Sequence, residues 1–460
     1  MKRTRTTTGQ TAMGSWSRRR FLRAAGVSGA AALALPGCGG GGGGALGGGS
    51  DGEVTELVVP TASTPWVDAY KAVLAEYENS SGISVTVREF PYEGLVTQYT
   101  NDIQSGAGTF DLFQLDEAWT GEFYDKEWAQ PVSDVSSGWS LDSETITYAD
   151  LPFWDPKARA SSPDGKPMGL PYNGNVELLT MRSDVYEDLG LETPRTWQDA
   201  IENGNRAMSK KAVEFGYAPR AQAVPSGQSI TYTFMPVFYS YGADWFAEPG
   251  KDWTPTVNTS EAIEAITTYR ELARLGPPET NSLGQAEVIA LMQSGRLLQT
   301  HTVAAASSQF LDPDASNVAD AVSFAELPAG PAGIAPTSGT WTLAIPAGLP
   351  ENRAKAAADL LTWLGEREQQ QKFADEGGIP NRHDVLADVT GEASAYLKPY
   401  AQSLEKDIYP SIRYVFNAAM LKPTEQVLAS ITAGDTEPKK GMNQLQDELT
   451  SVVRDAGFLD

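Results

Sequence analysis

Three short segments combine aromatic and hydrogen-bonding side chains directly after predicted β-strands. They span residues 61–66, 89–92 and 116–119. Because the carboxyl ends of parallel strands meet at one edge of an open sheet, where such sheets bind ligands, we expect the three segments to lie together. Aromatic rings pack against apolar C–H faces while polar side chains pair with hydroxyl groups, so this composition favours a polyhydroxylated ligand. The alternative, that the aromatic residues only pack the rim of the sheet, stays open.

The composition of the chain disfavours several other chemistries. Its 460 residues include two histidines and one cysteine, too few for a zinc, haem or iron–sulfur site or for an intramolecular disulfide. It has 35 basic against 59 acidic side chains and a net charge of −24, whereas a nucleic-acid-binding protein needs surplus Lys and Arg to neutralise phosphates. We therefore expect no metal, no cofactor and no nucleic-acid partner.

The elements that would position the three segments alternate strands with helices from residue 53 onward. Apolar residues at 66, 70, 73, 74 and 77 share one helical face, and Thr64 is expected to cap this helix with Pro65 in its first turn. Strands separated by helices of this length predict right-handed βαβ units and a parallel sheet. A second helix is predicted at 92–105, closed by Gly106, and strands are predicted at 57–60, 84–89 and 110–116.

The remainder of the chain continues this α/β pattern. Single cores stop growing at about 250–300 residues, so residues 53–460 require at least two cores. No long linker separates them, which predicts lobes joined by short crossovers. Further helices are predicted at 183–190, from Trp197 onward, and at 258–275, 288–298, 351–376 and 442–454.

The first 37 residues resemble an export signal rather than part of the fold. They contain seven basic side chains and no acidic one, and SRRRFLR (17–23) with the apolar run 24–35 resembles a twin-arginine signal. Residues 35–38, LPGC, resemble a lipobox, in which the thiol of Cys38 takes the lipid. The glycine-rich residues 38–52 then form a flexible tether, which places the body at the extracellular face of the cell membrane.

The acidity of the body fits a protein kept hydrated in concentrated salt, where self-repulsion is screened. Together with the lipoprotein signal, this balance resembles secreted haloarchaeal proteins. An acid-rich bacterial source is the alternative.

Four further segments share the order and motifs of one protein family. They are residues 165–199, with a GLP crossover and a PxTW turn; 241–278, with a glycine–acid loop before a helix; 290–300, ALMQSGRLLQT; and 338–386, with a GxWxLAIP strand and a GGxPxR turn. Together, over residues 53–460, they resemble extracellular solute-binding protein family 1, the carbohydrate-binding lipoproteins of ABC importers.

The resemblance implies a periplasmic-binding-protein-like α/β fold of two lobes with a hinge and a ligand cleft between them. One lobe would comprise 53–172 and 304–362, the other 176–300 and 366–460. The function implied is capture of a sugar or sugar alcohol, a mono- or disaccharide, and its delivery to a membrane permease driven by a separate ATPase. Such a protein is not an enzyme, and we expect a monomer.

The resemblance also implies ligand-binding positions in both lobes. Two of them have a structural alternative: Trp341 as lobe core, and Arg382 as the partner of a carboxylate on a hinge turn. Trp197 is assigned to packing. The positions implied are Ser63, Thr64, Trp66, Glu89, Asp116, Glu117, Tyr172, Asn173, Asn175, Tyr232, Trp245, Trp341, Arg382 and Tyr414.

One departure from the family pattern follows residue 300. Many sugar-binding members carry a GxW aromatic platform there, whereas this chain reads HTVAAASSQ. We expect His301 or Thr302 to substitute with hydrogen bonds, which disfavours a long maltodextrin-like ligand.

Two other functions stay open at this point. One is a receptor for a polyamine, peptide or anion. The other is a secreted glycosidase that uses two carboxylates such as Glu89 and Asp116, although no acidic pair lies in a recognisable catalytic motif.

Overall fold

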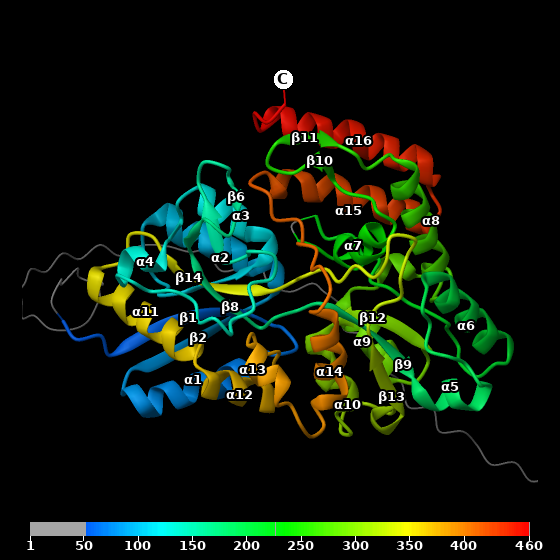
Figure 1. Ribbon diagram of the computed structural model, residues 1–460, viewed down its shortest axis with the longest axis horizontal. Helices are drawn as coiled ribbons and strands as arrows, with labels where there is room; N and C mark the ends of the chain where they lie inside the picture. The colour runs from blue at the N-terminus through cyan, green and yellow to red at the C-terminus, as the bar shows by residue number, and fades with distance from the viewer. Residues whose placement is uncertain (1–51, 226, 460) are drawn as a thin grey trace, which may run out of the picture. The chain divides into compact units, whose positions relative to one another are not determined.

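The structure is a computed structural model that describes residues 52–225 and 227–459. Figure 1 shows its helices arranged around two groups of strands. The predicted signal peptide (1–37), the lipidation of Cys38 and all but the last residue of the predicted tether (38–52) lie outside the described residues. No helix among the described residues combines the length and the apolar character needed to cross a membrane.

Strand β1 (Glu56–Ala62) and strand β2 (Ser84–Phe90) pair in parallel and are joined by helix α1 (Val67–Ser81), as predicted. Helix α1 buries Tyr70 and the other predicted apolar positions. The prediction of Thr64 as its cap is wrong, because the helix begins three residues later, with Trp66 at the N-cap and no side-chain cap. Trp66 is 1% exposed, and burying an indole gains about 2 kcal/mol or more, against about 1 kcal/mol for a cap.

The sheet of the first lobe is mixed rather than parallel. Strand β3 (Phe113–Asp116) lies beside β1, where the Asp111 amide donates to the Val58 carbonyl at 2.9 Å. Strand β14 (Trp341–Pro346) then pairs antiparallel with β3, with β8 (Gly169–Tyr172) and with β4 (Ala129–Gln130). The chain enters β14 from the other lobe, which reverses the direction expected of a βαβ repeat.

Helices cover this sheet on both sides. Helix α2 (Tyr92–Ser105) has the predicted bounds and ends at Gly106, whose φ of 65° is left-handed and favours glycine. The helix predicted at 351–376 is two helices, α11 (Glu351–Leu364) and α12 (Arg367–Asp375), because Glu366 is extended. The other elements near this sheet are α3 (Glu117–Asp125), α4 (Val132–Val135), β5 (Phe153–Asp155), β6 (Ala160–Ser161), β7 (Lys166–Pro167), α13 (His383–Ala387) and α14 (Ser394–Ser403).

The second lobe is built on an antiparallel sheet of order β12–β9–β13, comprising Gln299–Val303, Glu177–Arg182 and Val322–Ala325. Helix α15 (Asn417–Ala433) packs beside α16 (Pro438–Asp455), next to the hairpin β10–β11 (Figure 1). The other elements are α5 (Ser183–Leu189), α6 (Trp197–Ser209), α7 (Ile230–Ser240), β10 (Phe246–Glu248), β11 (Asp252–Pro255), α8 (Ser260–Ala273), α9 (Gln285–Gln293) and α10 (Ser307–Leu311), with short 3-10 turns at 280–282, 304–306 and 319–321.

Buried apolar side chains form two cores, which define the two lobes. The first gathers residues 57–178 and 341–400, with Ala304 and Ala305, and the second gathers most of 179–335 and 412–453. The chain therefore leaves the first core at the end of segment 173–178, returns to it through 336–340 and leaves it again through 401–411. Phe373 and Tyr400 pack in the first core, although the predicted boundaries assign residues 366–460 to the second lobe. The lobe boundaries themselves stay a prediction.

Candidate ligand-binding site

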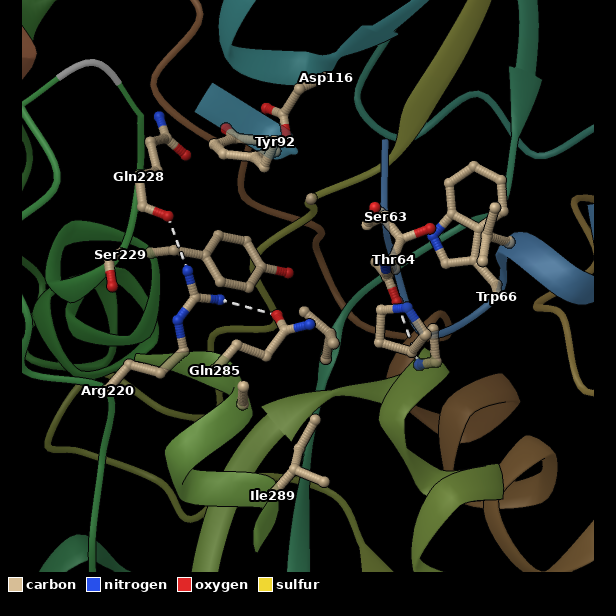
Figure 2. Close-up of a pocket in the computed structure, with 18 of the residues that line it drawn as sticks. Ser63, Thr64, Trp66, Tyr92, Asp116, Arg220, Gln228, Ser229, Gln285 and Ile289 are labelled. Atoms are coloured by element: carbon tan, nitrogen blue, oxygen red, sulfur yellow. Dashed lines mark hydrogen bonds between the residues drawn. The ribbon is translucent and has the colours of Figure 1, made fainter. Parts of the chain in front are cut away.

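A cavity of about 630 Å³ lies at the carboxyl ends of β1, β2 and β3. Its lining comes from both lobes (Figure 2). Of the predicted ligand-binding residues, eight line it. They are Ser63, Thr64, Trp66, Glu89, Asp116, Asn175, Tyr232 and Trp341.

Ser63 and Thr64, which follow β1, contribute hydroxyl groups to the first-lobe wall of the cavity. The Ser63 hydroxyl donates to Glu89 Oε1 at 2.7 Å, and Lys71 Nζ lies 2.6 Å from Glu89 Oε2. Hydrogen bonds from Lys71 and Ser63 lower the pKa of Glu89, so this exposed carboxylate is ionised and neutralised by Lys71. The Thr64 hydroxyl is buried and has no hydrogen-bond partner among residues 52–225 and 227–459. Thr64 therefore has its bonding capacity free for a ligand hydroxyl.

Asp116 ends β3 and caps helix α3. Its Oδ1 accepts a hydrogen bond from the Ala118 amide at 2.9 Å, and its side chain lies next to Tyr92 in Figure 2. Burial raises the pKa of Asp116 to about 7, with the charge of Glu117 adding to the effect and the Ala118 amide opposing it. Near neutral pH this carboxyl group is therefore present in both protonation states, able to accept or donate hydrogen bonds.

Aromatic rings close the cavity without offering a wide flat surface. Trp66 and Trp341 are 1% and 5% exposed and meet edge to face, with ring centroids 5.9 Å apart. Tyr92 packs against Trp119 with centroids 5.2 Å apart, and the Arg220 guanidinium lies 5.5 Å from the centroid of the Tyr232 ring. Because neighbours cover most of each ring, little ring face remains for a sugar to stack on.

The second-lobe wall is built around Arg220. Its Nη2 donates to the Gln228 carbonyl at 2.7 Å and its Nη1 to Gln285 Oε1 at 3.2 Å, as the dashed lines in Figure 2 show. Both acceptors are neutral, and the buried Nε of Arg220 has no hydrogen-bond partner in the part of the chain that the structure describes. Ser229 and further amides add hydrogen-bonding groups, contributed by Gln222, Gln293 and Gln309. This wall offers donors and acceptors with one positive charge.

The other six predicted positions do not line this cavity. Tyr172 is buried between Tyr70 and Phe373, with centroids 5.1 and 4.6 Å away. Asn173 is buried with a φ of 58°, and its Oδ1 accepts from the Ile379 amide at 3.2 Å. Tyr172 ends strand β8 and Asn173 follows it, and their side chains pack into the first lobe instead of lining the cavity.

Trp245 and Tyr414 belong to the second core. Trp245 packs on Phe238 at 4.7 Å between centroids, and Tyr414 stacks on Phe416 at 5.6 Å. Trp245 is fully buried in this core, whereas Tyr414 is half-buried and packs against it.

Arg382 and Glu117 are engaged in ion pairs. Arg382 pairs with Asp384 at 2.9 Å and with Asp142 at 3.3 Å. These contacts match the alternative in which Arg382 is the partner of a carboxylate. Glu117 is fully buried and pairs with Arg413 at 2.8 Å.

His301 and Thr302 do not substitute for the missing aromatic platform at the cavity. His301 is fully buried, with Nδ1 2.6 Å from the Tyr217 hydroxyl and Nε2 2.7 Å from the Thr233 carbonyl. Burial lowers the pKa of His301 to about 4, so it is neutral, with its proton on Nε2 facing the carbonyl. Thr302 is also buried, and the same strand instead brings Val303 to the cavity.

Sequence reasoning predicted Tyr232 in the second-lobe wall but missed the rest of that wall. Arg220, Gln222, Gln228 and Ser229 belong to an irregular segment without periodicity, and Gln285 opens helix α9. The one available signal was a polar, Gly- and Pro-containing stretch before the apolar helix α7.

The fold and site define a two-lobed solute receptor, and comparison with known proteins agrees. The model of the bacterial extracellular solute-binding protein family matches residues 63–371, and the chain belongs to this family. This confirms both the family resemblance and the fold class predicted from the sequence.

Individual relatives extend the comparison. A probable amino-acid ABC transporter periplasmic-binding protein of Sinorhizobium fredii is 25% identical over 404 residues, 85% of this chain and 88% of the relative. The mannitol-binding protein of Pseudomonas aeruginosa is 29% identical over 309 residues, 66% of this chain and 67% of the relative. Among solved structures, an ABC transporter solute-binding protein from Agrobacterium radiobacter in complex with ribitol has a TM-score of 0.75 at 20% identity, covering 87% of this chain and 99% of that one.

Proposed function

We propose that this protein is the substrate-binding lipoprotein of an ABC importer and captures a sugar alcohol or small sugar between its two lobes. The observation that carries the proposal is the cavity lining, in which neutral hydroxyl and amide groups from both lobes converge on about 630 Å³. Each ligand hydroxyl is both donor and acceptor, so it pairs with Ser, Thr, Asn and Gln side chains without leaving a buried polar group unpaired.

The lining favours a sugar alcohol over a ring sugar. A pyranose gains much of its affinity from an exposed aromatic face, and Trp66 and Trp341 have almost none. An acyclic polyol depends on hydrogen bonds, which the amides around Arg220 supply. The mannitol-binding relative and the ribitol-bound structure support the same class of ligand.

The remaining parts of the proposal concern partners and location. Delivery requires a membrane permease and its separate ATPase, which the family association with ABC transporters supports. Export through a twin-arginine signal, lipid anchoring through Cys38 at the extracellular face, a monomeric state and a haloarchaeal source rest on the sequence patterns alone. Capture and release involve no bond breaking, so we propose that the protein is not an enzyme.

Thermal unfolding with a ligand panel tests the proposal. Mannitol, ribitol, erythritol, glucose, maltose, amino acids and spermidine would each be added in molar salt. A ligand at 100 times its Kd stabilises the folded state by about 2.7 kcal/mol, so we expect a clear rise in Tm with one or more polyols. A rise in Tm with only amino acids or spermidine would mean that the ligand belongs to one of those classes and is not a sugar or polyol. Hydrolysis of a chromogenic glycoside that is lost in Glu89→Gln or Asp116→Asn would replace the function with that of a glycosidase.

A further inference from the structure

Glu117 lies at the meeting point of several chain segments. It is fully buried, and each of its two carboxylate oxygens accepts two hydrogen bonds. Oε2 accepts from the Ser338 hydroxyl at 2.6 Å and from the Thr340 amide at 3.2 Å. Oε1 accepts from the Ser411 amide at 3.1 Å and from Arg413 Nη1 at 2.8 Å. A buried carboxylate with four donors, one of them the guanidinium of its ion-pair partner Arg413, is well compensated and costly to disrupt.

The donors to Glu117 come from the segments that connect the lobes. Ser338 and Thr340 lie where the chain returns to the first lobe, and Ser411 lies where it leaves again. These segments also bond to one another and to the first crossover. The Ser338 amide donates to the Tyr409 carbonyl at 2.9 Å, and the Gly339 amide donates to the Asn175 carbonyl at 2.9 Å. Glu117 therefore joins α3 of the first lobe to a bundle of three crossovers.

The same network reaches both walls of the cavity. On one side, Glu117 follows Asp116 directly. On the other, the Ser411 hydroxyl donates to Gln228 Oε1 at 2.5 Å, and the Gln228 carbonyl accepts from Arg220 Nη2 at 2.7 Å. A continuous path of covalent and hydrogen bonds thus runs from Asp116, through the crossovers, to Arg220.

Close packing fixes α3 against this region. A Cβ atom on Gly121 would lie 2.1 Å from the Arg413 carbonyl oxygen, so the helix and the crossover meet with no room for a side chain. Arg413 also donates to the carbonyls of Tyr148 and Ala149 in the first lobe. The guanidinium and the backbone carbonyl of Arg413 therefore both contact the first lobe. The chain after Arg413 continues into helix α15 of the second lobe.

We propose that Glu117 is a positioning residue that couples occupancy of the cavity to the relative arrangement of the lobes, and does not contact the ligand. This inference rests on the proposed function. A ligand that binds Asp116 and Arg220 together engages the two ends of the Glu117 network, so it binds the lobe arrangement that the network stabilises more tightly than any other. Weakening the network redistributes the lobes without altering a ligand contact.

The variant Glu117→Gln tests the proposal, with Asp111→Asn as its matched control. Asp111 is also fully buried and pairs with an arginine, Arg353 at 2.6 Å, but its contacts stay within the first lobe. Both variants would be examined by thermal unfolding, by small-angle X-ray scattering without ligand, and by calorimetric titration with D-mannitol. We expect both to lower Tm.

Only Glu117→Gln is expected to change the ligand-free scattering profile and to weaken mannitol binding, by about tenfold. The proposal is overturned if both variants lower Tm while their scattering and affinity match the wild type. Should Glu117→Gln not fold, Ser411→Ala removes the hydroxyl bond to Gln228 and leaves the Ser411 amide in place, and the same two readouts decide. If the wild type binds nothing in the panel, the proposed function fails, and the ligand-free scattering still judges the role of Glu117.

Discussion

Asp116 and Arg220 face the same cavity from opposite lobes, and neither forms an ion pair with any residue that the structure describes. The third charged lining residue, Glu89, is neutralised by Lys71. Among the described residues the cavity thus holds one carboxyl group and one guanidinium group without an ion-pair partner, and each can form hydrogen bonds with ligand hydroxyls. Their separation on two lobes makes them the pair through which a ligand can hold the lobes together.

Asp116 makes stability depend on pH. Its pKa is raised to about 7 in the folded protein from 3.8, so between these values the folded state binds more protons than the unfolded state. The folded form is therefore progressively destabilised as pH rises toward 7, and the full penalty is present above it. Because Asp116 is partly exposed to the cavity, we expect about 1–2 kcal/mol.

The check is urea unfolding of Asp116→Asn and wild type at pH 5 and pH 8.5. The free energy of unfolding of the variant, relative to that of wild type, should be higher at pH 8.5 than at pH 5. An identical difference at both values would show that the carboxyl group titrates normally.

Arg220 is expected to dominate the second-lobe wall. Arg220→Met keeps the apolar stem and removes the donors to Gln228 and Gln285, so mannitol affinity should fall about 10–100-fold, since hydrogen bonds to a charged group contribute about 1.5–3 kcal/mol. Arg296→Met is the control, because Arg296 forms an exposed pair with Glu214 outside the cavity lining. Equal affinities of the two variants in calorimetric titration would remove Arg220 from the site.

His301 should sensitise the fold to acid without affecting binding. Its pKa falls to about 4 in the folded state from 6.5, so stability is lost as pH decreases from 6.5 toward 4, by up to about 3 kcal/mol. His301→Gln should flatten this loss in thermal scans between pH 4 and 7, whereas His383→Gln, at an exposed position, should not. Mannitol affinity of a folded His301→Gln protein should equal that of wild type. A lower affinity would return His301 to the binding site.

Gly121 tests the contact between α3 and the crossover. Gly121→Ala places a methyl group 2.1 Å from the Arg413 carbonyl oxygen, and relieving such a clash typically costs about 1–3 kcal/mol. Gly94→Ala in α2 is the control, since its Cβ would meet only Pro91 Cδ at 3.8 Å and a helical glycine-to-alanine change stabilises by about 0.5–1 kcal/mol. Opposite shifts in the urea midpoint are expected. A neutral Gly121→Ala variant would mean that the crossover moves away freely.

The sequence pattern correctly predicted those features of the fold that depend on local interactions and on the order of the elements. Helix α2 has the predicted bounds because Gly106 takes a left-handed conformation that ends a helix wherever it occurs. The strand-end residues Ser63, Glu89 and Asp116 reach the cavity because the order of strands and helices dictates which strand ends meet. The split of the predicted 351–376 helix was not visible, since Gly365 could equally have been accommodated within a helix.

The sequence by itself determined the family and its two-lobed α/β architecture, because its motif segments resemble that family in content and order. It also determined the first-lobe half of the cavity, because strand order dictates which strand ends meet. Apart from Tyr232, tertiary structure decided the second half, because Arg220 and Gln285 are brought together across 65 positions by packing that no local pattern encodes. It also separated the neighbours Asp116 and Glu117. Asp116 is extended at the end of β3 and Glu117 is the first residue of helix α3, so one carboxylate faces the cavity while the next points inward to Arg413.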